Sequence, residues 1–464
     1  MIRGVTKNIS FGGAADKDSD PTEVIIPFHI DKRNGVTTDQ GGWKRRPGFA
    51  EKWDLGESSS VTLLIPEYGG YAATRNGKVF TIGDTPVRLG DIELTGIHRP
   101  YYVWYRTQTL SRPIAIIVDG GRPVKISTQP NEIDYLGGAP VKARFAGVID
   151  TRLVLAGHND LDFVWSDLEN PESFPAANFN AVAGDGEAIL NFKISERLLF
   201  FFKTHSVEIW INLGTDFGRR NTFKPGLNAP DSLISSFRNF YWYADDGDFY
   251  MMQSGQTPEI ISGQYTSYLR EIGDLGSLYG IDFHIERVAR WFAPQINRCF
   301  VYDYAHRVFS EDNQWNGDWM RMPILSYMEQ SPNSCYVGDY NQTGKIYHWS
   351  WDYKTDNGNV IRSYRKFVVP LTDDGGLARA NRLRLRLKRG QATMGRGKAL
   401  VAWRIDGGDR YTEDVDLGAT GENDPYADIW NLGVGKEMEL EFVESEPDES
   451  IIAQAFLTSE QLGG

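Results

Sequence analysis

Residues 61–82 read VTLLIPEYGGYAATRNGKVFTI, which is three short apolar runs separated by turn residues. The second and third runs are joined through Asn76-Gly77. Asn-Gly between two alternating apolar runs is the strongest short signal for a β-hairpin. This segment therefore predicts three consecutive strands joined by tight turns.

The same order of strand, turn, strand, turn, strand and long loop recurs until about residue 365. Two further examples are residues 152–166 and 238–252. We count about seven such units at a spacing of roughly 40 residues, which is typical of a β-propeller with about four strands per blade. The sequence thus predicts an all-β fold in which residues 59–365 form a β-propeller of about seven blades. Residues 265–278 break the rhythm, and we expect a short helix there.

The segments on either side of the repeats have different patterns. Residues 1–58 contain loop residues and a basic turn, Trp43-Lys-Arg-Arg-Pro-Gly-Phe49, so we expect an irregular N-terminal arm with a docking segment. In residues 366–464, apolar and charged residues alternate strictly, which predicts strands with one apolar face. The clearest alternation places Leu383, Leu385 and Leu387 between Arg382, Arg384, Arg386 and Lys388. We therefore predict a small C-terminal β domain that resembles a sandwich.

Charge within the C-terminal part is unevenly distributed. Residues 377–404 hold nine Lys or Arg and no acid, whereas residues 406–449 hold fifteen Asp or Glu and two bases. The two halves could face each other as solvated strands of one domain. Alternatively, the basic face could dock an acidic partner or the acidic stretch of a neighbouring copy.

The overall composition limits the classes of function. The chain has 464 residues and a formal net charge of −13, which argues against tight phosphate binding by the whole molecule but suits a wall past which DNA slides. Cys299 and Cys335 lie in apolar runs and are expected to be buried free thiols. The start of the chain lacks the apolar region of a signal peptide, and no run approaches the roughly 18 apolar residues of a membrane span. We therefore expect synthesis and folding in a cytosol, without membrane insertion.

Patterns typical of enzymes are missing from the sequence. The seven histidines show no metal-ligand spacing, and there is no Gly-x-Ser-x-Gly elbow, Walker loop or dinucleotide fingerprint. Four acids, Glu132, Asp134, Asp160 and Asp162, are interpreted as turn formers. We expect a protein that is not an enzyme, with no catalytic residue, metal or cofactor.

A glycan-binding or glycan-hydrolysing propeller is the alternative. The aromatic runs of residues 101–105 and 241–243 could stack on sugar rings, although alternation predicts that half of each run is core. Residues 310–319 are similar to the Asp box of sialidase-like propellers, but Gln314 stands where that motif has Gly and the motif does not recur.

Several stretches carry a family resemblance. They are residues 44–49 (KRRPGF), 152–158 (RLVLAGH), 163–171 (FVWSDLENP), 198–214 (LLFFFKTHSVEIWINLG) and 254–256 (SGQ). Together they resemble the tail nozzle proteins of short-tailed (podovirus-type) bacteriophages, also known as tail hub or packaged-DNA stabilisation proteins. The resemblance spans roughly residues 40–350 as a pattern, and the C-terminal part matches only in type.

The resemblance implies a structural protein of the virion, made in the host cytoplasm. A homohexameric ring would extend the DNA channel below the portal and the head-to-tail adaptor ring. It would retain packaged DNA and pass it at ejection without sequence-specific binding, and it would carry tail spike, fibre or needle proteins. Docking is expected to involve two basic segments, with the candidate residues Lys44, Arg45, Arg46, Arg382, Arg384, Arg386 and Lys388.

Overall fold

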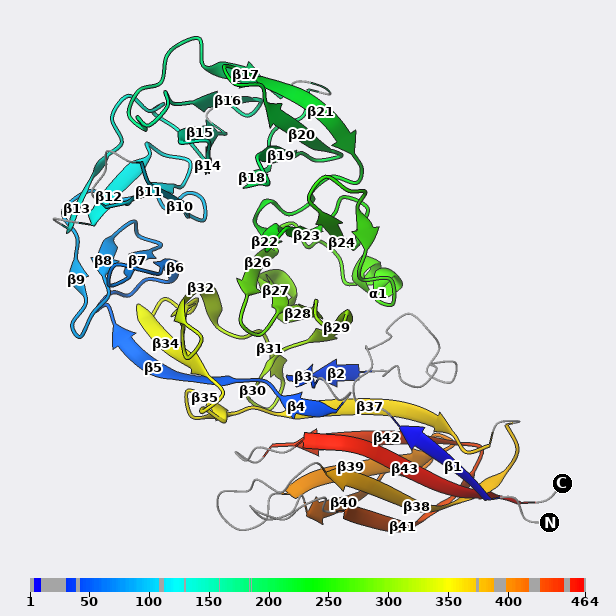
Figure 1. The fold of residues 1–464 in the computed structure, drawn as a ribbon. Coiled ribbons are helices and arrows are strands. Elements are labelled where there is room, and N and C mark those ends of the chain that lie inside the picture. Colours follow the sequence, from blue (N-terminus) through cyan, green and yellow to red (C-terminus); the bar gives the residue numbers. More distant parts are fainter. Residues whose placement is uncertain are drawn as a thin grey trace.

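The protein is a ring of small β-sheets joined at its rim to a two-layered β-sandwich (Figure 1). The computed structural model describes residues 4–9, 31–38, 42–107, 112–128, 131–157, 159–182, 184, 186–372, 375–387, 398–416, 426–445 and 451–462. Strands account for nearly all of their secondary structure. The only α-helix among them is α1 (Thr266–Glu271), within the segment for which a short helix was predicted.

Five sheets of the ring have four consecutive antiparallel strands each. The first two contain β6 (Val61–Ile65), β7 (Tyr71–Thr74), β8 (Val79–Thr81) and β9 (Val87–Arg88), then β10 (Tyr101–Tyr105), β11 (Ile114–Val118), β12 (Val124–Thr128) and β13 (Asn131–Tyr135). The next two contain β14 (Phe145–Ile149), β15 (Arg152–Ala156), β16 (Asp162–Trp165) and β17 (Phe179–Ala181), then β18 (Asn191–Ser195), β19 (Leu198–Phe202), β20 (Val207–Asn212) and β21 (Phe217–Phe223). The fifth follows the short 3-10 helix η1 (Pro230–Ser232) and contains β22 (Ile234–Ser236), β23 (Asn239–Tyr243), β24 (Phe249–Gln253) and β25 (Glu259–Ile260).

Two larger sheets complete the ring. One begins with β26 (Tyr279–Phe283), β27 (Val288–Ala293), β28 (Arg298–Asp303) and β29 (Val308–Glu311), with the 3-10 helix η2 (Pro294–Ile296) between β27 and β28. The other contains β32 (Ile324–Ser331), β33 (Ser334–Asp339) and β34 (Lys345–Ser350), and its fourth strand is β5 (Gly48–Asp54). The antiparallel pairing of β5 with β34 aligns Phe49 with Trp349, so an early strand completes the last sheet of the ring.

Hydrophobic clusters lie between all neighbouring sheets of the ring. Cluster residues such as Leu63 and Ile117 join the first two sheets, and Phe163 and Phe201 join the third and fourth. The cluster that contains Ile346 and Leu64 joins the last sheet back to the first. Large aromatic side chains fill these wedge-shaped gaps well, which explains the high aromatic content of the repeats. The ring is therefore closed by packing as well as by β5.

The tight turns within the sheets use residues with positive φ. Gly77 (φ +88°) ends the predicted Asn-Gly hairpin, and a side chain there would meet the backbone of Leu94 at 2.2 Å. Only glycine fits such a position without strain. The hairpin prediction for residues 61–82 is thus confirmed by β6, β7 and β8.

The sandwich consists of two antiparallel layers. One layer orders β3 (Gly35–Thr37), β4 (Trp43–Arg45), β43 (Ile451–Gln461), β38 (Ala378–Leu387) and β41 (Tyr426–Gly435), with β1 (Gly4–Ile9) also paired to β43. The other layer orders β37 (Ser363–Pro370), β42 (Glu437–Glu444), β39 (Lys398–Ile405) and β40 (Tyr411–Asp416). The predicted alternation is confirmed at Leu383 and Leu385, which are fully buried in the core between the layers.

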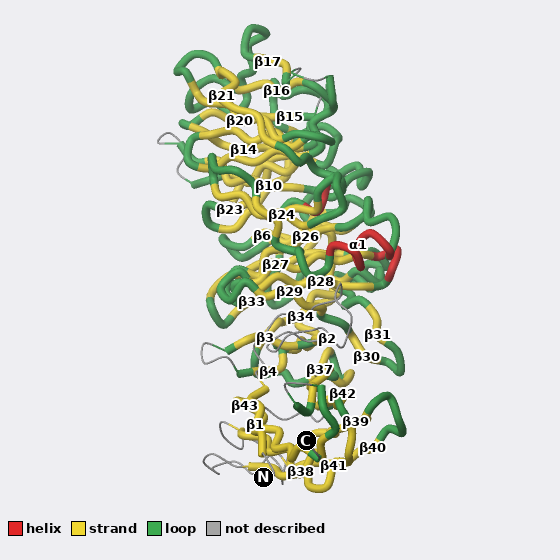
Figure 2. Tube along the Cα trace, turned by 90° about the vertical axis from the view of Figure 1, so that its right-hand side faces the viewer, coloured by secondary structure: helices red, strands yellow, loops and turns green. Residues whose placement is uncertain are grey.

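A short strand connects the ring to the sandwich. In β2 (Asp31–Arg33), Arg33 pairs with Glu311 of β29 on one side, and all three residues pair with β37 on the other. A single nine-stranded sheet thus runs from the ring into one layer of the sandwich. Figure 2, turned by 90°, shows the ring edge-on with the sandwich beyond its rim.

The expectation of an irregular arm over residues 1–58 is wrong for the described part, which contains five strands. Four of them, β1, β2, β4 and β5, pair with residues more than 250 positions away, and β3 pairs with β4. Four short strands outside the regular repeat form two hairpins. One hairpin pairs β30 (Gln314–Trp315) with β31 (Trp319–Met320). The other pairs β35 (Thr355–Asp356) with β36 (Asn359–Val360) and adjoins β5 through β35. Cys299 and Cys335 are buried and free, as predicted. None of the described helices is long and apolar enough to cross a membrane.

Candidate functional site

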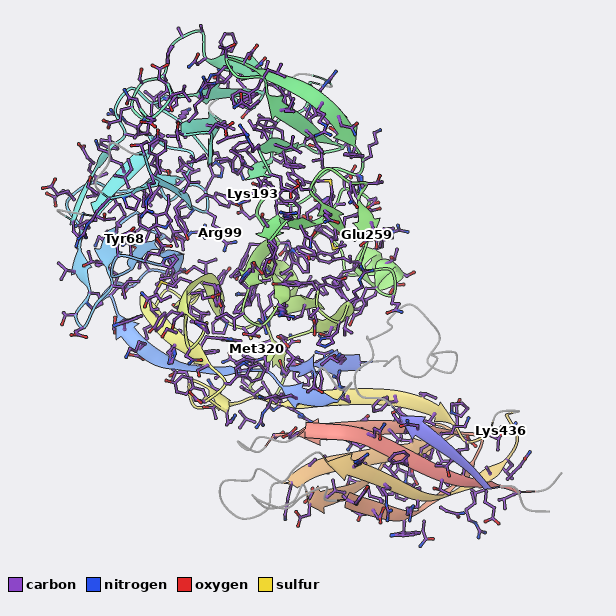
Figure 3. The ribbon with its side chains drawn as sticks, viewed as in Figure 1. Tyr68, Arg99, Lys193, Glu259, Met320 and Lys436 are labelled. Atoms are coloured by element: carbon purple, nitrogen blue, oxygen red, sulfur yellow. The ribbon has the colours of Figure 1, made fainter. Side chains whose placement is uncertain are left out.

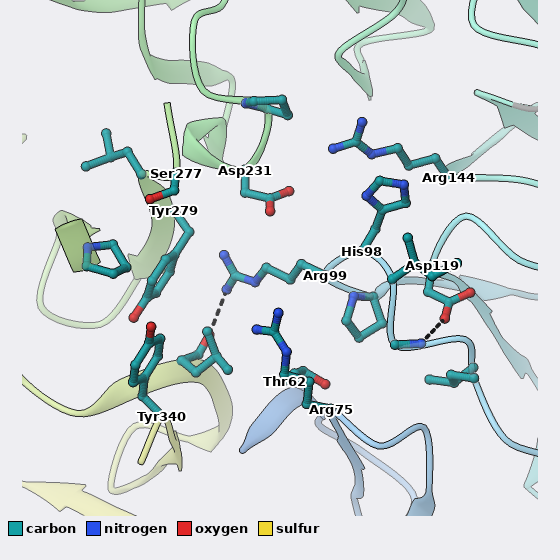
Figure 4. A pocket seen from close by; sticks show the side chains of 18 of the residues that line it. Thr62, Arg75, His98, Arg99, Asp119, Arg144, Asp231, Ser277, Tyr279 and Tyr340 are labelled. Atoms are coloured by element: carbon teal, nitrogen blue, oxygen red, sulfur yellow. Dashed lines mark hydrogen bonds between the residues drawn. The ribbon is translucent and has the colours of Figure 1, made fainter. Parts of the chain in front are cut away.

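One enclosed cavity of the described residues lies inside the ring. It is a cavity of about 430 Å³, lined by residues from six of the sheets of the ring. Its position follows from the fold: the innermost strands and the loops that enter them converge on the centre (Figures 1 and 3). Figure 4 shows the lining side chains pointing toward this space from all sides.

Arg99 occupies the middle of the cavity. It lies just before β10, and its guanidinium Nη1 and Nη2 atoms donate to the carbonyls of Gly280 (3.1 Å) and Leu325 (3.0 Å). The guanidinium also lies 5.2 Å from the ring centre of Tyr279. These contacts come from two other sheets, so Arg99 is held in one position by neutral groups.

Three further basic side chains, Arg75, His98 and Arg144, line the same cavity. The guanidinium of Arg144 lies 5.1 Å from the ring centre of Phe145, and its buried Nε–H has no hydrogen-bond acceptor among the described residues. Burial lowers the pKa of His98, and the nearby charge of Arg144 lowers it further. His98 therefore favours the neutral form, as expected for an imidazole close to a fixed cation.

The two carboxylates of the cavity have internal partners. Asp119 accepts hydrogen bonds from the hydroxyl of Thr95 (2.7 Å) and the backbone N–H groups of Gly96 (3.1 Å) and Gly121 (3.0 Å), so it stabilises a turn. Asp231 accepts a hydrogen bond from the hydroxyl of Tyr101 at 2.8 Å. Neither carboxylate forms an ion pair with a cavity arginine in the described part of the chain.

A second cavity of about 260 Å³ adjoins the first and shares Arg99 and Asp231 with it. Lys193 of β18 projects into this space, and its Nζ lies 5.0 Å from the ring centre of Tyr101. Burial lowers the pKa of Lys193 to about 8, and the charge of Arg99 contributes. The two cavities together form a space inside the ring that is lined by bases, in a chain whose net charge is −13.

Such an arrangement can hold an anion, whereas support for hydrolysis is weak. A glycosidase needs two carboxyl groups placed on either side of a bond, and here Asp119 is engaged by a turn. Within the described residues, no group of three or more His, Cys, Asp or Glu side chains lies close enough together to hold a metal ion.

The first predicted docking segment is largely buried. Arg46 forms a fully buried ion pair with Asp356, with an Nη2–Oδ2 distance of 2.6 Å, and Arg45 is only 4% exposed. These two side chains hold the chain together internally, so the docking prediction is corrected for Arg45 and Arg46. Lys44 is half-buried and lies 4.0 Å from the ring centre of Trp351.

The second predicted docking segment lies on the outer face of β38. Arg384 forms two hydrogen bonds of 2.8 Å with Asp428 of β41, and Arg382 lies 3.9 Å from the same carboxylate. The basic strand thus faces the acidic stretch of the same chain, one of the two interpretations of the charge pattern. Arg386 lies opposite Tyr426 in the strand register, and Lys388 is outside the described residues.

The aromatic runs considered for glycan binding differ in burial. Tyr241, Trp242 and Tyr243 are all buried between sheets, so that run is core. Residues 101–104 are half-buried, and Tyr101 and Tyr102 line the second cavity.

Sequence reasoning did not single out the bases inside the ring. Arg99 and Arg144 stand one or two positions before the first strand of a repeat, and Lys193 lies within such a strand. A search for bases at the start of each repeat would have found them, because first strands are innermost in a propeller-like ring. Their convergence depends on ring closure, which no local pattern shows.

Comparisons with known proteins give no family assignment. No protein-family model matches the chain, and no curated protein matches it. Among solved structures, the computationally designed protein Ika8 is similar at 10% identity and a TM-score of 0.39, over 64% of this chain and 99% of its own. PorZ, a surface component of the type-IX secretion system of Porphyromonas gingivalis, is similar at 12% identity and a TM-score of 0.39, over 79% of this chain and 46% of its own.

A protein described as the extracellular domain of a one-component system from B. thetaiotaomicron is similar at 10% identity and a TM-score of 0.45, over 82% of this chain and 47% of its own. This chain therefore spans just under half the length of the last two proteins. The matches concern the β-propeller-like fold alone.

Proposed function

We propose that the four-stranded units of the ring are seven blades of a β-propeller, and that the chain is a structural subunit of the nozzle, or hub, of a short phage tail. Residues 59–365 would be the propeller body and residues 366–464 the C-terminal domain, with strands from residues 1–58 built into both. The particular identity rests on the resemblance of residues 40–350 to tail nozzle proteins.

The observation that carries a structural role is the nine-stranded sheet that joins the ring to the sandwich. A hydrogen-bonded sheet resists bending at the junction far better than a flexible linker, because its strands share backbone bonds and side-chain contacts. A rigid, elongated subunit suits a conduit that must withstand the pressure of packaged DNA.

Buried charges strengthen the same junction. Arg290 of β27 is fully buried and contacts Asp312 (2.9 Å) and Glu286 (2.8 Å), and the Arg46–Asp356 pair lies close by, where β5 meets β35. Breaking such a pair leaves an uncompensated buried charge, so each pair strongly disfavours other arrangements. The ring and the sandwich would therefore move as one body.

In the proposed assembly, six copies form a ring around a DNA channel in the virion. One end would contact the head-to-tail adaptor ring, and spike, fibre or needle proteins would attach elsewhere. Closure of six copies requires one repeated heterologous contact at a fixed rotation. The subunit would have no enzymatic role and no cofactor.

The test is the mass of the purified protein in solution, with and without DNA-filled phage heads that lack tails. We expect a sixfold ring on these heads and an end to DNA leakage. A protein that stays monomeric and leaves leakage unchanged would contradict the proposal. Phage heads that contain no DNA serve as the control for non-specific adsorption of the protein.

A second candidate function is glycan binding, and the aromatic and basic lining of the two cavities favours it. Half-buried Tyr101 and Tyr102 and the buried Tyr279 offer ring faces or edges to these cavities, and the ring of Tyr279 lies 5.2 Å from the guanidinium of Arg99. Because only Asp231 among the carboxylates of the first cavity is not engaged in a turn, binding is favoured over hydrolysis. Binding of an immobilised glycan panel, together with an assay for released sugar, separates these two activities.

A further inference from the structure

The two cavities inside the ring contain basic side chains that lack an acidic partner. Arg75, Arg99, Arg144 and Lys193 line them, and none of the four forms an ion pair with a described residue. Arg46 and Arg290 show the contrast, since each is buried against a carboxylate within 3 Å. Arg99, Arg144 and Lys193 are half-buried, whereas Arg75 is exposed. Half-buried cations are costly without a contacting counter-charge, so these three bases favour a further source of negative charge.

The acids of these cavities form no ion pair with these bases among the described residues, and the charge of Asp231 acts on Lys193 and His98 only from farther away. Asp119 stabilises a turn, and Asp231 accepts a hydrogen bond from Tyr101. Asp282, which lines the second cavity, lies 3.4 Å from the hydroxyl of Tyr304 and 3.5 Å from Nδ1 of His284. The arginines are left with neutral partners: two carbonyls for Arg99 and the ring of Phe145 for Arg144.

We infer that the cavity inside the ring binds a compact organic oxyanion, a carboxylate or phosphate group carried on a body of the size of one sugar. Guanidinium groups are the preferred partners of both oxyanions, because their N–H groups match the spacing of two oxygens. Arg144 and Arg99 would hold the anionic group, and the buried Nε–H of Arg144 would gain its missing acceptor.

The shape of the cavity indicates where the rest of the ligand lies. Tyr279 and Tyr340 are nearly parallel, with ring centres 6.4 Å apart, and they stand across the cavity from Arg144 and His98 (Figure 4). A volume of about 430 Å³ is within the range of small-molecule sites in proteins. A ligand with one charged end and one ring would therefore place its ring toward the tyrosines.

His98 and Lys193 add a pH-dependent part to the site. The charges of Arg144, Asp231 and Asp119 act on His98, and those of Arg99 and Asp231 act on Lys193. A bound anion would favour the protonated form of both bases. Binding is therefore expected to tighten as the pH falls from 9 toward 6.

The experiment is calorimetric titration of the full chain with three probes that share one sugar ring: glucuronate, glucose 6-phosphate and glucose. We expect saturable binding of at least one charged probe, with a dissociation constant of about 1 mM or below, and none of glucose. The first two probes distinguish a carboxylate ligand from a phosphate ligand. Binding of neither, or equal binding of glucose, would overturn the inference.

Two variants and one control locate the site. Arg144→Gln removes the cation and is expected to weaken binding of the charged probe by about tenfold or more. Arg220→Gln removes an exposed arginine from β21 and is expected to leave binding unchanged. If Arg144→Gln does not fold, Arg75→Gln tests the same cavity, since Arg75 is exposed at its mouth. Unchanged binding in a folded cavity variant would overturn the inference.

The site lies within a single chain, so this outcome is independent of ring assembly. A chain that binds glucuronate but ignores phage heads would support the oxyanion site and contradict the nozzle. A chain that assembles on phage heads but binds no probe would support the nozzle and contradict the oxyanion site.

Discussion

At the scale of single residues, buried charge is the most consequential feature of this protein. Arg46 and Asp356 are each buried completely and contact each other at 2.6 Å, although they are far apart in the sequence. Removing one partner leaves the other as an isolated charge in a medium of low polarity, whereas removing both leaves only a packing defect. The pair therefore specifies how β5 meets β35.

Arg46→Met is expected to destabilise the protein by about 3–5 kcal/mol, whereas the double variant with Asp356→Leu should lose less than the sum of the two single changes. Midpoints of urea unfolding measure both effects. Glu93→Gln is the matched control, because its ion pair with Arg88 is exposed and should contribute less than about 1 kcal/mol. If Arg46→Met lowers the free energy of unfolding as little as Glu93→Gln does, the Arg46–Asp356 pair is accessible to water.

Lys193 is expected to give stability a specific pH dependence. Its pKa is lowered to about 8 in the folded chain by burial and by Arg99, from an ordinary value of 10.5. Between these two values the unfolded chain binds more protons at this site, so its contribution to stability rises with pH across that window. Relative to Lys193→Met, the native protein should gain stability from pH 8 to pH 10.

The measurement is the difference in urea midpoint between the native protein and Lys193→Met across this pH range. Other titrating groups, such as Asp231 and Tyr101 beside Lys193, are common to both proteins, so much of their effect cancels in the difference. A constant difference would show that Lys193 titrates as an ordinary surface lysine.

At the scale of strands and sheets, β5 is the element on which ring closure depends. Phe49 on this strand is buried and packs against Tyr347 and Trp349, with ring centres 5.1 and 6.1 Å away. It thus covers the end of the cluster between the last two sheets of the ring. Loss of the Phe49 side chain would expose the place where the first and last parts of the ring of sheets meet.

Phe49→Ala is expected to lower stability by about 3–5 kcal/mol, the range for removal of a buried aromatic side chain. Lys52→Ala, on the same strand but exposed, should change it by less than about 0.5 kcal/mol. Thermal unfolding of both variants, compared with the native chain, tests this difference. Equal effects would indicate that β5 contributes only through its backbone.

The repeated hairpins of the ring and the alternation in β38 could be predicted from sequence, because both are local patterns. Strands β2, β3 and β4 could not, since three residues show no periodicity and the partners of β2 and β4, such as Tyr364 for Arg33, are distant. The boundary expected at residue 365 also falls inside β37, because that strand extends the sheet of β2. The bases inside the ring escaped prediction for the same reason: each belongs to a different repeat.

At the scale of the whole molecule, the continuous sheet and the buried junction predict cooperative behaviour. β2 pairs with β29 of the ring and with β37 of the sandwich, and Trp43 of the nearby β4 is part of the sandwich core, so the two units are joined through residues close in sequence. We expect a single main transition in calorimetry rather than one for each unit. Two well-separated transitions would contradict this and would indicate that the junction melts independently.

Docking through the basic strand can be tested while the intrachain pair is kept. In Arg384→Asp with Asp428→Arg, the contact between β38 and β41 is retained but the positions of the two charges are exchanged. If the basic face docks an acidic partner, this swap should reduce assembly on DNA-filled heads several-fold while thermal stability remains close to native. Assembly at the native level would leave Arg384 with the intrachain role alone.

The pairing of early strands with late ones also determines when the chain can finish folding on the ribosome. β5 needs β34, and β1 needs β43, which is the last strand. At bacterial rates of translation, the strands near the N-terminus must wait on the order of tens of seconds before their partners emerge. During that time their edges are unpaired and open to chaperones or to other nascent chains. Slower translation of the second half of the message would lengthen this exposure, so synthesis speed itself becomes a determinant of yield.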